Sequence, residues 1–123
     1  ASCAAFQPLP AMSVYAATKA FLLHYTRALR EELAPRGVLV TAVCPYWIKT
    51  EFMTVARDTA NPGAVQSTPF AMRPEAVAAW SLTMNGLGAG VVTCGPIPFV
   101  MRLGGKILPA GIPMRIWDNI RKL

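Results

Sequence analysis

Apolar positions between residues 13 and 33 recur at the spacing of an α-helix. Four of them are separated by three, four and four residues: Leu22, Tyr25, Leu29 and Leu33. Many of the other positions hold Ala or Arg, which favour helices, and Pro35-Arg36-Gly37 interrupts the pattern. The spacing therefore predicts one helix from Ser13 to Leu33.

The run that follows this helix has the pattern of a strand. Residues Val38 to Cys44 are almost all apolar or β-branched, which is typical of a strand buried on both faces of a parallel sheet. Residues 1–12 are small and apolar with two prolines, and we expect the end of a buried strand running into a loop. Strand, helix and strand in this order predict an α/β fold with a right-handed crossover.

The second half of the chain predicts three more helices and one strand. Residues 46–72 form a long irregular segment, and a helix is expected from Pro74 to about Met84. A short strand is expected at Val91–Cys94, and helices at Pro98–Lys106 and Pro113–Leu123. The glycines at 86, 88 and 90 lead from a helix into a strand, whereas a pyrophosphate-binding turn follows a strand and opens a helix. We interpret them as a helix cap and connector.

Composition limits the class of protein. The 123 residues allow one domain at most, and 54% hydrophobic against 15% charged residues exclude a disordered chain. The net charge is +6, but the twelve basic residues form no run, so we expect no nucleic-acid partner. Basic residues outnumber acidic ones near the carboxyl end, which leaves open an anionic partner or a membrane surface beside a simple solvated face.

Membrane and metal functions are disfavoured. Residues 76–101 carry no charge, but glycines and prolines interrupt them, so we expect a soluble core rather than a membrane span. The three cysteines Cys3, Cys44 and Cys94 are far apart and form no C-x-x-C pair. We expect buried thiols in a reducing compartment, a cytoplasmic location and no metal site.

Tyr15 and Lys19 are the first candidates for chemistry. Their i,i+4 spacing puts a phenol and an ammonium on one face of the predicted helix. A free tyrosine is a poor acid or base at neutral pH, and a fixed cation nearby stabilises the phenolate. The pair is therefore a candidate for proton transfer. Ser2, thirteen residues earlier, could reach the same substrate oxygen.

Several motifs together resemble the short-chain dehydrogenase/reductase family. They are Ser2, the Tyr15-Ala16-Ala17-Thr18-Lys19-Ala20 segment, Leu29-Arg30-Glu31-Glu32-Leu33, and Val40 with Pro45. The resemblance covers residues 1 to about 53. It implies the second half of a Rossmann-like, doubly wound parallel sheet with three α/β/α layers, incomplete in this chain.

The resemblance also implies roles for individual residues. Tyr15 would exchange a proton with the alcohol or carbonyl oxygen, and Ser2 would hydrogen-bond that oxygen. Lys19 would tune Tyr15 and hold the nicotinamide ribose. A segment lining the nicotinamide would fall on Pro45, Ile48 and Thr50. Tyr46 stands where the family usually has glycine, which puts the local backbone in doubt because tyrosine tolerates a positive φ poorly.

The family's Gly-rich cofactor turn and its upstream asparagine are missing from this sequence. We therefore expect residues 1–123 to be the carboxyl-terminal portion of a single dehydrogenase domain, inactive alone and a homo-oligomer when complete. The cofactor would be NAD or NADP, a choice that this sequence leaves open.

The substrate implied is an alcohol or ketone, and the residues after the second strand indicate that it is apolar. They are Tyr46, Trp47, Phe52, Met53, Phe70 and Met72. Packing beneath a lid explains them equally well. A serine hydrolase is disfavoured because His24, the one histidine, falls in mid-helix. The alternative left open is a non-catalytic fragment or interaction module derived from the same fold.

Overall fold

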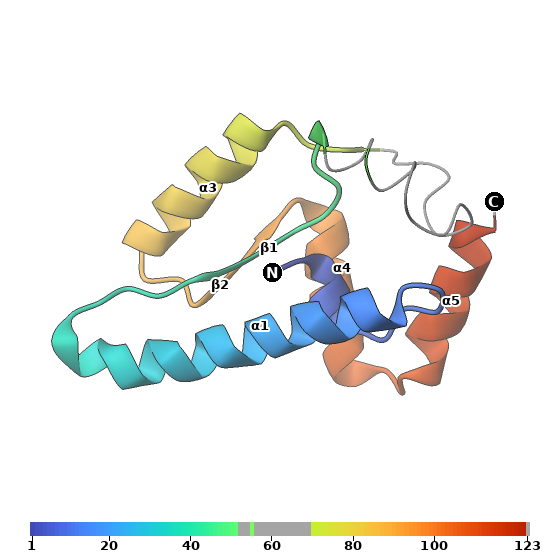
Figure 1. Ribbon diagram of the computed structural model, residues 1–123, viewed down its shortest axis with the longest axis horizontal. Coiled ribbons are helices and arrows are strands. Elements are labelled where there is room, and N and C mark those ends of the chain that lie inside the picture. The colour runs from blue at the N-terminus through green and yellow to red at the C-terminus, as the bar shows by residue number, and fades with distance from the viewer. Residues whose placement is uncertain (52–54, 56–69, 123) are drawn as a thin grey trace.

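The computed structural model describes residues 1–51, 55 and 70–122 (Figure 1). Its elements, with η for 3-10 helices, are η1 (Cys3–Phe6), α1 (Ser13–Leu33), η2 (Ala34–Arg36), β1 (Ala42–Pro45), α3 (Pro74–Gly86), β2 (Val91–Cys94), α4 (Pro96–Ile107) and α5 (Gly111–Arg121). Helix α1 is the longest and runs beneath the two strands in this view.

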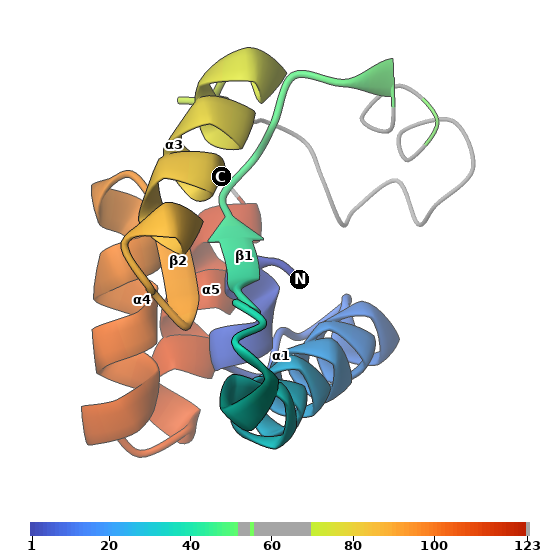
Figure 2. The ribbon, with the colours of Figure 1, turned by 90° about the vertical axis from the view of Figure 1, so that its left-hand side faces the viewer.

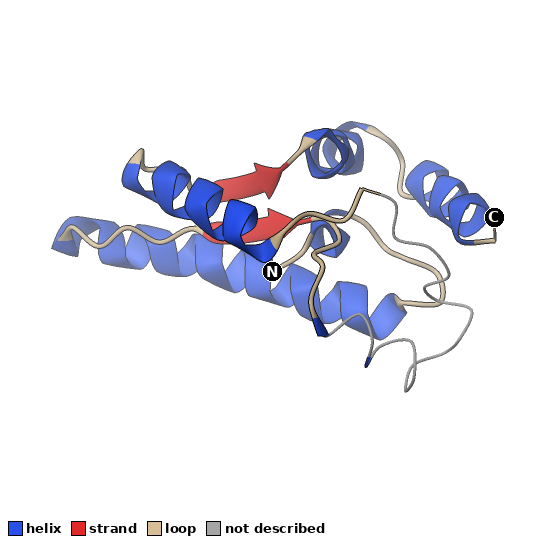
Figure 3. Ribbon diagram, turned by 90° about the horizontal axis from the view of Figure 1, so that it is seen from above, coloured by secondary structure: helices blue, strands red, loops and turns tan. Residues whose placement is uncertain are grey.

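The two strands form a parallel sheet. Ala42 pairs with Val91, and the register continues to Pro45 opposite Cys94. Parallel neighbours need a crossover connection, and the chain between them contains α3. Figure 3 shows the strands side by side, with helices on either side of them. The predicted α/β class is confirmed, and the arrangement is compatible with part of a Rossmann-like sheet.

Helices cover both faces of this sheet. Side chains alternate between faces along a strand, so one strand can pack on two layers. Leu23 of α1 packs against Ala42 and Cys44 on one face. On the other face, Val77 of α3 packs against Val92. The end-on view in Figure 2 shows α1 and α3 on opposite sides of the strands, which gives three layers.

Most predicted elements are confirmed with small shifts of their ends. The helix predicted for residues 13–33 and the strand predicted for residues 91–94 have the predicted bounds. Helix α3 extends two residues beyond Met84, and α4 and α5 each begin two residues before the predicted proline. A proline within the first turns costs little, since the backbone N–H groups there have no intrahelical partner.

The predicted strand from Val38 to Cys44 is shorter than expected. Strand β1 begins only at Ala42, where its pairing with β2 begins. Val38 and Leu39 are 46% and 53% exposed, so burial on both faces is wrong for them. The apolar pattern predicts a strand from residue 38 on, but no strand among the described residues pairs with the part before Ala42.

The expected strand end within residues 1–12 is also wrong in part. Cys3–Phe6 is a 3-10 helix, although Ser2 itself has extended dihedral angles. The backbone N–H of Ala5 donates to the carbonyl oxygen of Ser2 at 3.0 Å, and the Ser2 hydroxyl accepts from the N–H of Ala4 at 3.2 Å. Local hydrogen bonds therefore replace a ladder in this segment.

The Gly86–Gly90 connector is confirmed as a helix end. Helix α3 ends at Gly86, and Gly88 has a φ of 79°, which lets the chain turn towards β2 at little steric cost. Arg30 of α1 holds this turn, because its guanidinium donates to the carbonyl oxygens of Gly88 at 2.7 Å and Val40 at 2.9 Å.

The uncharged stretch from 76 to 101 is divided among α3, β2 and α4. None of the helices in the described residues combines the length and the apolar content that crossing a membrane requires.

Candidate active site

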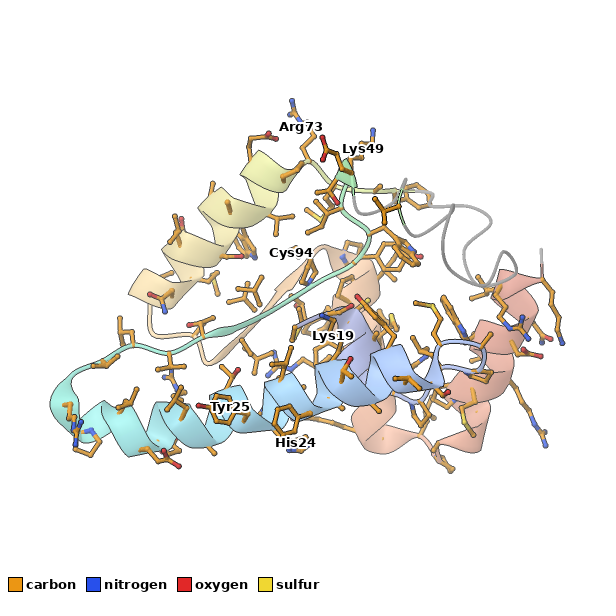
Figure 4. The ribbon with its side chains drawn as sticks, viewed as in Figure 1. Lys19, His24, Tyr25, Lys49, Arg73 and Cys94 are labelled. Carbon is orange, nitrogen blue, oxygen red and sulfur yellow. The ribbon has the colours of Figure 1, made fainter. Side chains whose placement is uncertain are left out.

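Tyr15 and Lys19 lie in the first turns of α1. The Lys19 ammonium nitrogen is 5.2 Å from the centroid of the Tyr15 ring. Both side chains are half-buried. At this distance the cation is attracted to the ring face, which holds the two side chains together. Figure 4 shows Lys19 on the side of α1 towards the strands and His24 on the opposite side, so His24 points away from Lys19.

A cavity of about 180 Å³ opens beside Tyr15. Its lining includes five of the six residues that the sequence singled out: Ser2, Tyr15, Pro45, Ile48 and Thr50. Lys19, the sixth, does not line the cavity and contacts the Tyr15 ring instead. The structure therefore brings all six into one neighbourhood, at the carboxyl end of β1 and the amino end of α1.

The segment after β1 is held in place by backbone hydrogen bonds. The N–H of Lys49 donates to the carbonyl oxygen of Met72 at 2.9 Å, and the N–H of Met72 donates to that of Trp47 at 2.8 Å. Ile48 and Met72 form the parallel bridge between the two segments. This short ladder positions Ile48 and Thr50 along the cavity wall.

Tyr46 lies in the cavity wall without backbone strain. Among the described residues other than glycine, only Ala11 and Phe70 have a positive φ, so the expected conformational cost at Tyr46 does not arise. The ring packs edge-on against Trp47 with centroids 6.0 Å apart. Burial raises the pKa of Tyr46, so its phenol stays neutral.

The Ser2 hydroxyl can donate as well as accept. Its oxygen accepts the hydrogen bond from Ala4 that begins η1. A hydroxyl also carries one proton that it can donate, so the same side chain can hydrogen-bond an oxygen in the cavity. Ser2 is half-buried and lines the cavity, as does Tyr15.

The cavity suits a neutral ligand with one polar oxygen. Most of its lining is apolar, with the hydroxyls of Ser2 and Tyr15 among the few polar groups. Hydroxyl donors beside apolar walls can bind a carbonyl oxygen and exclude water around it. In residues 1–51, 55 and 70–122, no cluster of three potential metal ligands occurs.

The cavity residues that the sequence reasoning did not assign to the site include two from the carboxyl-terminal helices. Met101 of α4 and Trp117 of α5 line the same cavity, about one hundred residues after Ser2. The Trp117 indole N–H donates to the carbonyl oxygen of Pro10 at 3.1 Å, which fixes α5 against the loop before α1. The apolar stripe of the last helix indicated a buried face, but no local pattern indicated what it would cover.

The aromatic and methionine residues after β1 do not all lie at the cavity. Tyr46 and Trp47 line the cavity, whereas Met72 packs on the core beside β2. Phe70 is 82% exposed. Phe52 and Met53 lie outside the described residues.

The thiol of Cys3 in the cavity wall makes stability depend on pH. Burial raises the pKa of Cys3 from 9.0 to about 11. As pH rises from about 9 to about 11, the unfolded thiol ionises while the folded one keeps its proton. We therefore expect the free energy of unfolding to fall by on the order of 2 kcal/mol across this window, measured by urea denaturation.

A Cys3→Ala variant is the control, because other groups also titrate at high pH. The difference between the two proteins isolates the thiol. The same pH dependence in both would contradict the assignment to Cys3.

Comparison with known proteins finds similarity in the first half of the chain. Residues 1–61 match the family model described as short chain dehydrogenase. Over 58 residues the chain is 36% identical to the very-long-chain 3-oxoacyl-CoA reductase of Bos taurus, covering 47% of this chain and 19% of that protein.

Two further relatives also have names that contain the word dehydrogenase. The chain is 48% identical over 52 residues to the putative dehydrogenase/reductase SDR family member 4-like 1 of Homo sapiens, covering 42% of this chain and 18% of that protein. It is 38% identical over 61 residues to the hydroxysteroid dehydrogenase-like protein 1 of Gallus gallus, covering 50% and 18%. The matched segments thus span less than a fifth of each of these relatives. No solved structure matches it.

Proposed function

We propose that this chain is the catalytic part of a short-chain dehydrogenase/reductase that interconverts an apolar ketone and its alcohol with NAD or NADP. The observation that carries the proposal is the shared cavity of Ser2 and Tyr15, with Lys19 against the Tyr15 ring. Names of relatives that denote reductases and dehydrogenases support the same chemistry.

Tyr15 would transfer the proton. In the reducing direction its hydroxyl gives a proton to the carbonyl oxygen, and the resulting phenolate takes one back from solvent. The Lys19 ammonium stabilises the anionic ring in between. The Ser2 hydroxyl donates to the same oxygen and keeps it within reach of Tyr15, since both line one cavity.

The nicotinamide cofactor would supply the hydride for the carbonyl carbon. Residues that fit it are present in the cavity wall. Pro45 and Ile48 offer apolar contacts to a flat ring, and the Thr50 hydroxyl offers a hydrogen bond to an amide. Lys19, being half-buried and cationic, would bind the ribose hydroxyls.

Apolar walls favour an apolar ketone. Burying a charged substrate group among them would cost its hydration without a partner. The name of the bovine relative specifies an acyl substrate, which is consistent with an aliphatic ketone here.

A Lys19→Met variant tests the cofactor role in the complete protein that carries this chain. Removing the ammonium while keeping the length of the side chain should weaken binding of the reduced cofactor about tenfold or more and lower the turnover number as well. Binding is measured by fluorescence titration of the reduced nicotinamide, and turnover by its absorbance.

Lys49→Met is the matched control. Lys49 is an exposed lysine that does not line the cavity, so its loss should leave both quantities unchanged. Unchanged cofactor titration in the Lys19 variant would refute the ribose role.

A second candidate function is a non-catalytic interaction module. Several large apolar side chains are exposed, among them Phe21 and Tyr25, whose rings stack on α1 with centroids 6.3 Å apart. Such a surface is typical of a face that another segment or protein covers. Reduction of a ketone by the complete protein would favour the enzyme over this alternative.

A further inference from the structure

A second apolar cavity lies between α4 and α5. It has a volume of about 180 Å³ and is lined by residues from both helices, among them Val100, Gly104, Ile116 and Ile120. We call this cavity the α4–α5 groove. Figure 1 shows the two helices connected by a short segment; α4 crosses α1 in this view, and α5 lies beyond the amino end of α1.

The α4–α5 groove and the candidate active-site cavity are neighbours with a shared wall. Tyr46, Met101 and Trp117 line both of them. These side chains come from the end of β1, from α4 and from α5. A molecule bound beside Tyr15 could therefore extend past these three side chains and between the two helices.

The lining of the groove extends along both helices. Its lining on α4 runs from Ile97 to Gly104, and on α5 from Pro113 to Ile120. Seven residues of helix rise about 10 Å, so each wall extends over about two turns. An extended chain fits such a shape better than a compact group does.

The lining also selects a neutral, apolar occupant. No charged side chain lines the groove, and Gln7 and Tyr46 are its polar members besides Trp117. The indole N–H of Trp117 is already bonded to the Pro10 carbonyl oxygen. A charged group placed there would lose its hydration without gaining a partner. Methylene groups have no favourable hydration to lose, and they would gain contacts on both walls.

We propose that the α4–α5 groove binds the unbranched aliphatic tail of the substrate whose carbonyl group lies beside Ser2 and Tyr15. The inference deepens the proposed function and rests on it for the identity of the reacting group. It makes Gly104 a determinant of chain length, since an added Cβ there meets only Leu108 Cδ1, at 3.8 Å, and a larger side chain would occupy the groove.

The test is calorimetric titration of the 123-residue chain with straight-chain methyl ketones from pentanone to undecanone. We expect the dissociation constant to fall about three- to fourfold for each added methylene until the groove is filled, and then to level off. Gly104→Leu should remove this dependence on length and leave the shortest ketone's affinity unchanged.

Gly111→Leu is the matched control, because a Cβ added at Gly111 would meet no atom within 4 Å and Gly111 lines neither cavity. It should bind every ketone as the parent does. A second pair guards against misfolding: Val100→Asp puts a charge in the groove and should abolish tight binding of undecanone, whereas Phe99→Asp, on an exposed neighbour outside the groove, should not.

Equal affinity for short and long ketones, or equal losses in both members of either pair, would overturn the proposal. The titration requires no cofactor and no turnover, so it is independent of the proposed reaction. Length-dependent binding without any ketone reduction by the complete protein would refute the proposed reaction but not the binding of a tail in the groove. Ketone reduction without length-dependent binding would refute the binding in the groove but not the reaction.

Discussion

Tyr15→Phe should lower the turnover number of the complete protein by about 10²–10⁴-fold. The variant keeps the ring, and with it the contact to Lys19, but loses the proton that the carbonyl oxygen receives. Affinity for the nicotinamide cofactor should stay nearly the same, since only the transfer step is removed. Steady-state kinetics with a methyl ketone, together with a cofactor titration, measure both.

Tyr25→Phe is the natural control for this variant. Tyr25 lies on the same helix, is 56% exposed and does not line the cavity, so its hydroxyl should be dispensable. If the Tyr15 variant kept a near-normal rate, Tyr15 would not be the acid, and the proposed chemistry would have to be abandoned.

Gly105→Ala should destabilise the fold although alanine favours helices. A Cβ at Gly105 of α4 would lie 2.2 Å from the backbone carbonyl oxygen of Phe6, a distance that no real contact allows. Helix α4 would have to move away from η1, the element that follows Ser2. We expect the free energy of unfolding to fall by about 1–3 kcal/mol, as overpacking typically costs, measured by urea denaturation.

The adjacent Gly104 supplies the control. An added Cβ there meets only the end of the Leu108 side chain at 3.8 Å, which is ordinary contact. Gly104→Ala should therefore be neutral or stabilise α4 by up to about 1 kcal/mol, from helix propensity alone. Equal effects of the two substitutions would contradict the close packing of α4 on η1.

Local patterns predicted the elements well where one segment decides them. The spacing of apolar residues predicted α1, and its end at Leu33, shortly before Pro35, needed no tertiary information. Strand β2 was equally clear from four consecutive residues between turns. The Tyr15 and Lys19 pair was visible because both lie on one helix, where a fixed spacing implies contact.

Features that depend on distant neighbours were not predictable. The length of β1 follows from where β2 pairs with it, and Val38 has the composition of a strand without a partner among the described residues. Trp117 reaches the cavity only because α5 folds back onto Pro10. Tyr46 was expected to be strained by analogy, but the backbone there never enters the left-handed region.

The three tyrosines of the chain allow the most direct test of a ligand site that contains Tyr15. With ¹³C-labelled tyrosine, the ring signals can be followed by NMR while heptanone is added to the 123-residue chain. The account predicts that the signals of Tyr15 and Tyr46, which line the cavity, shift and saturate together while that of Tyr25 stays constant. A shift confined to Tyr25, or no response at Tyr15, would contradict it.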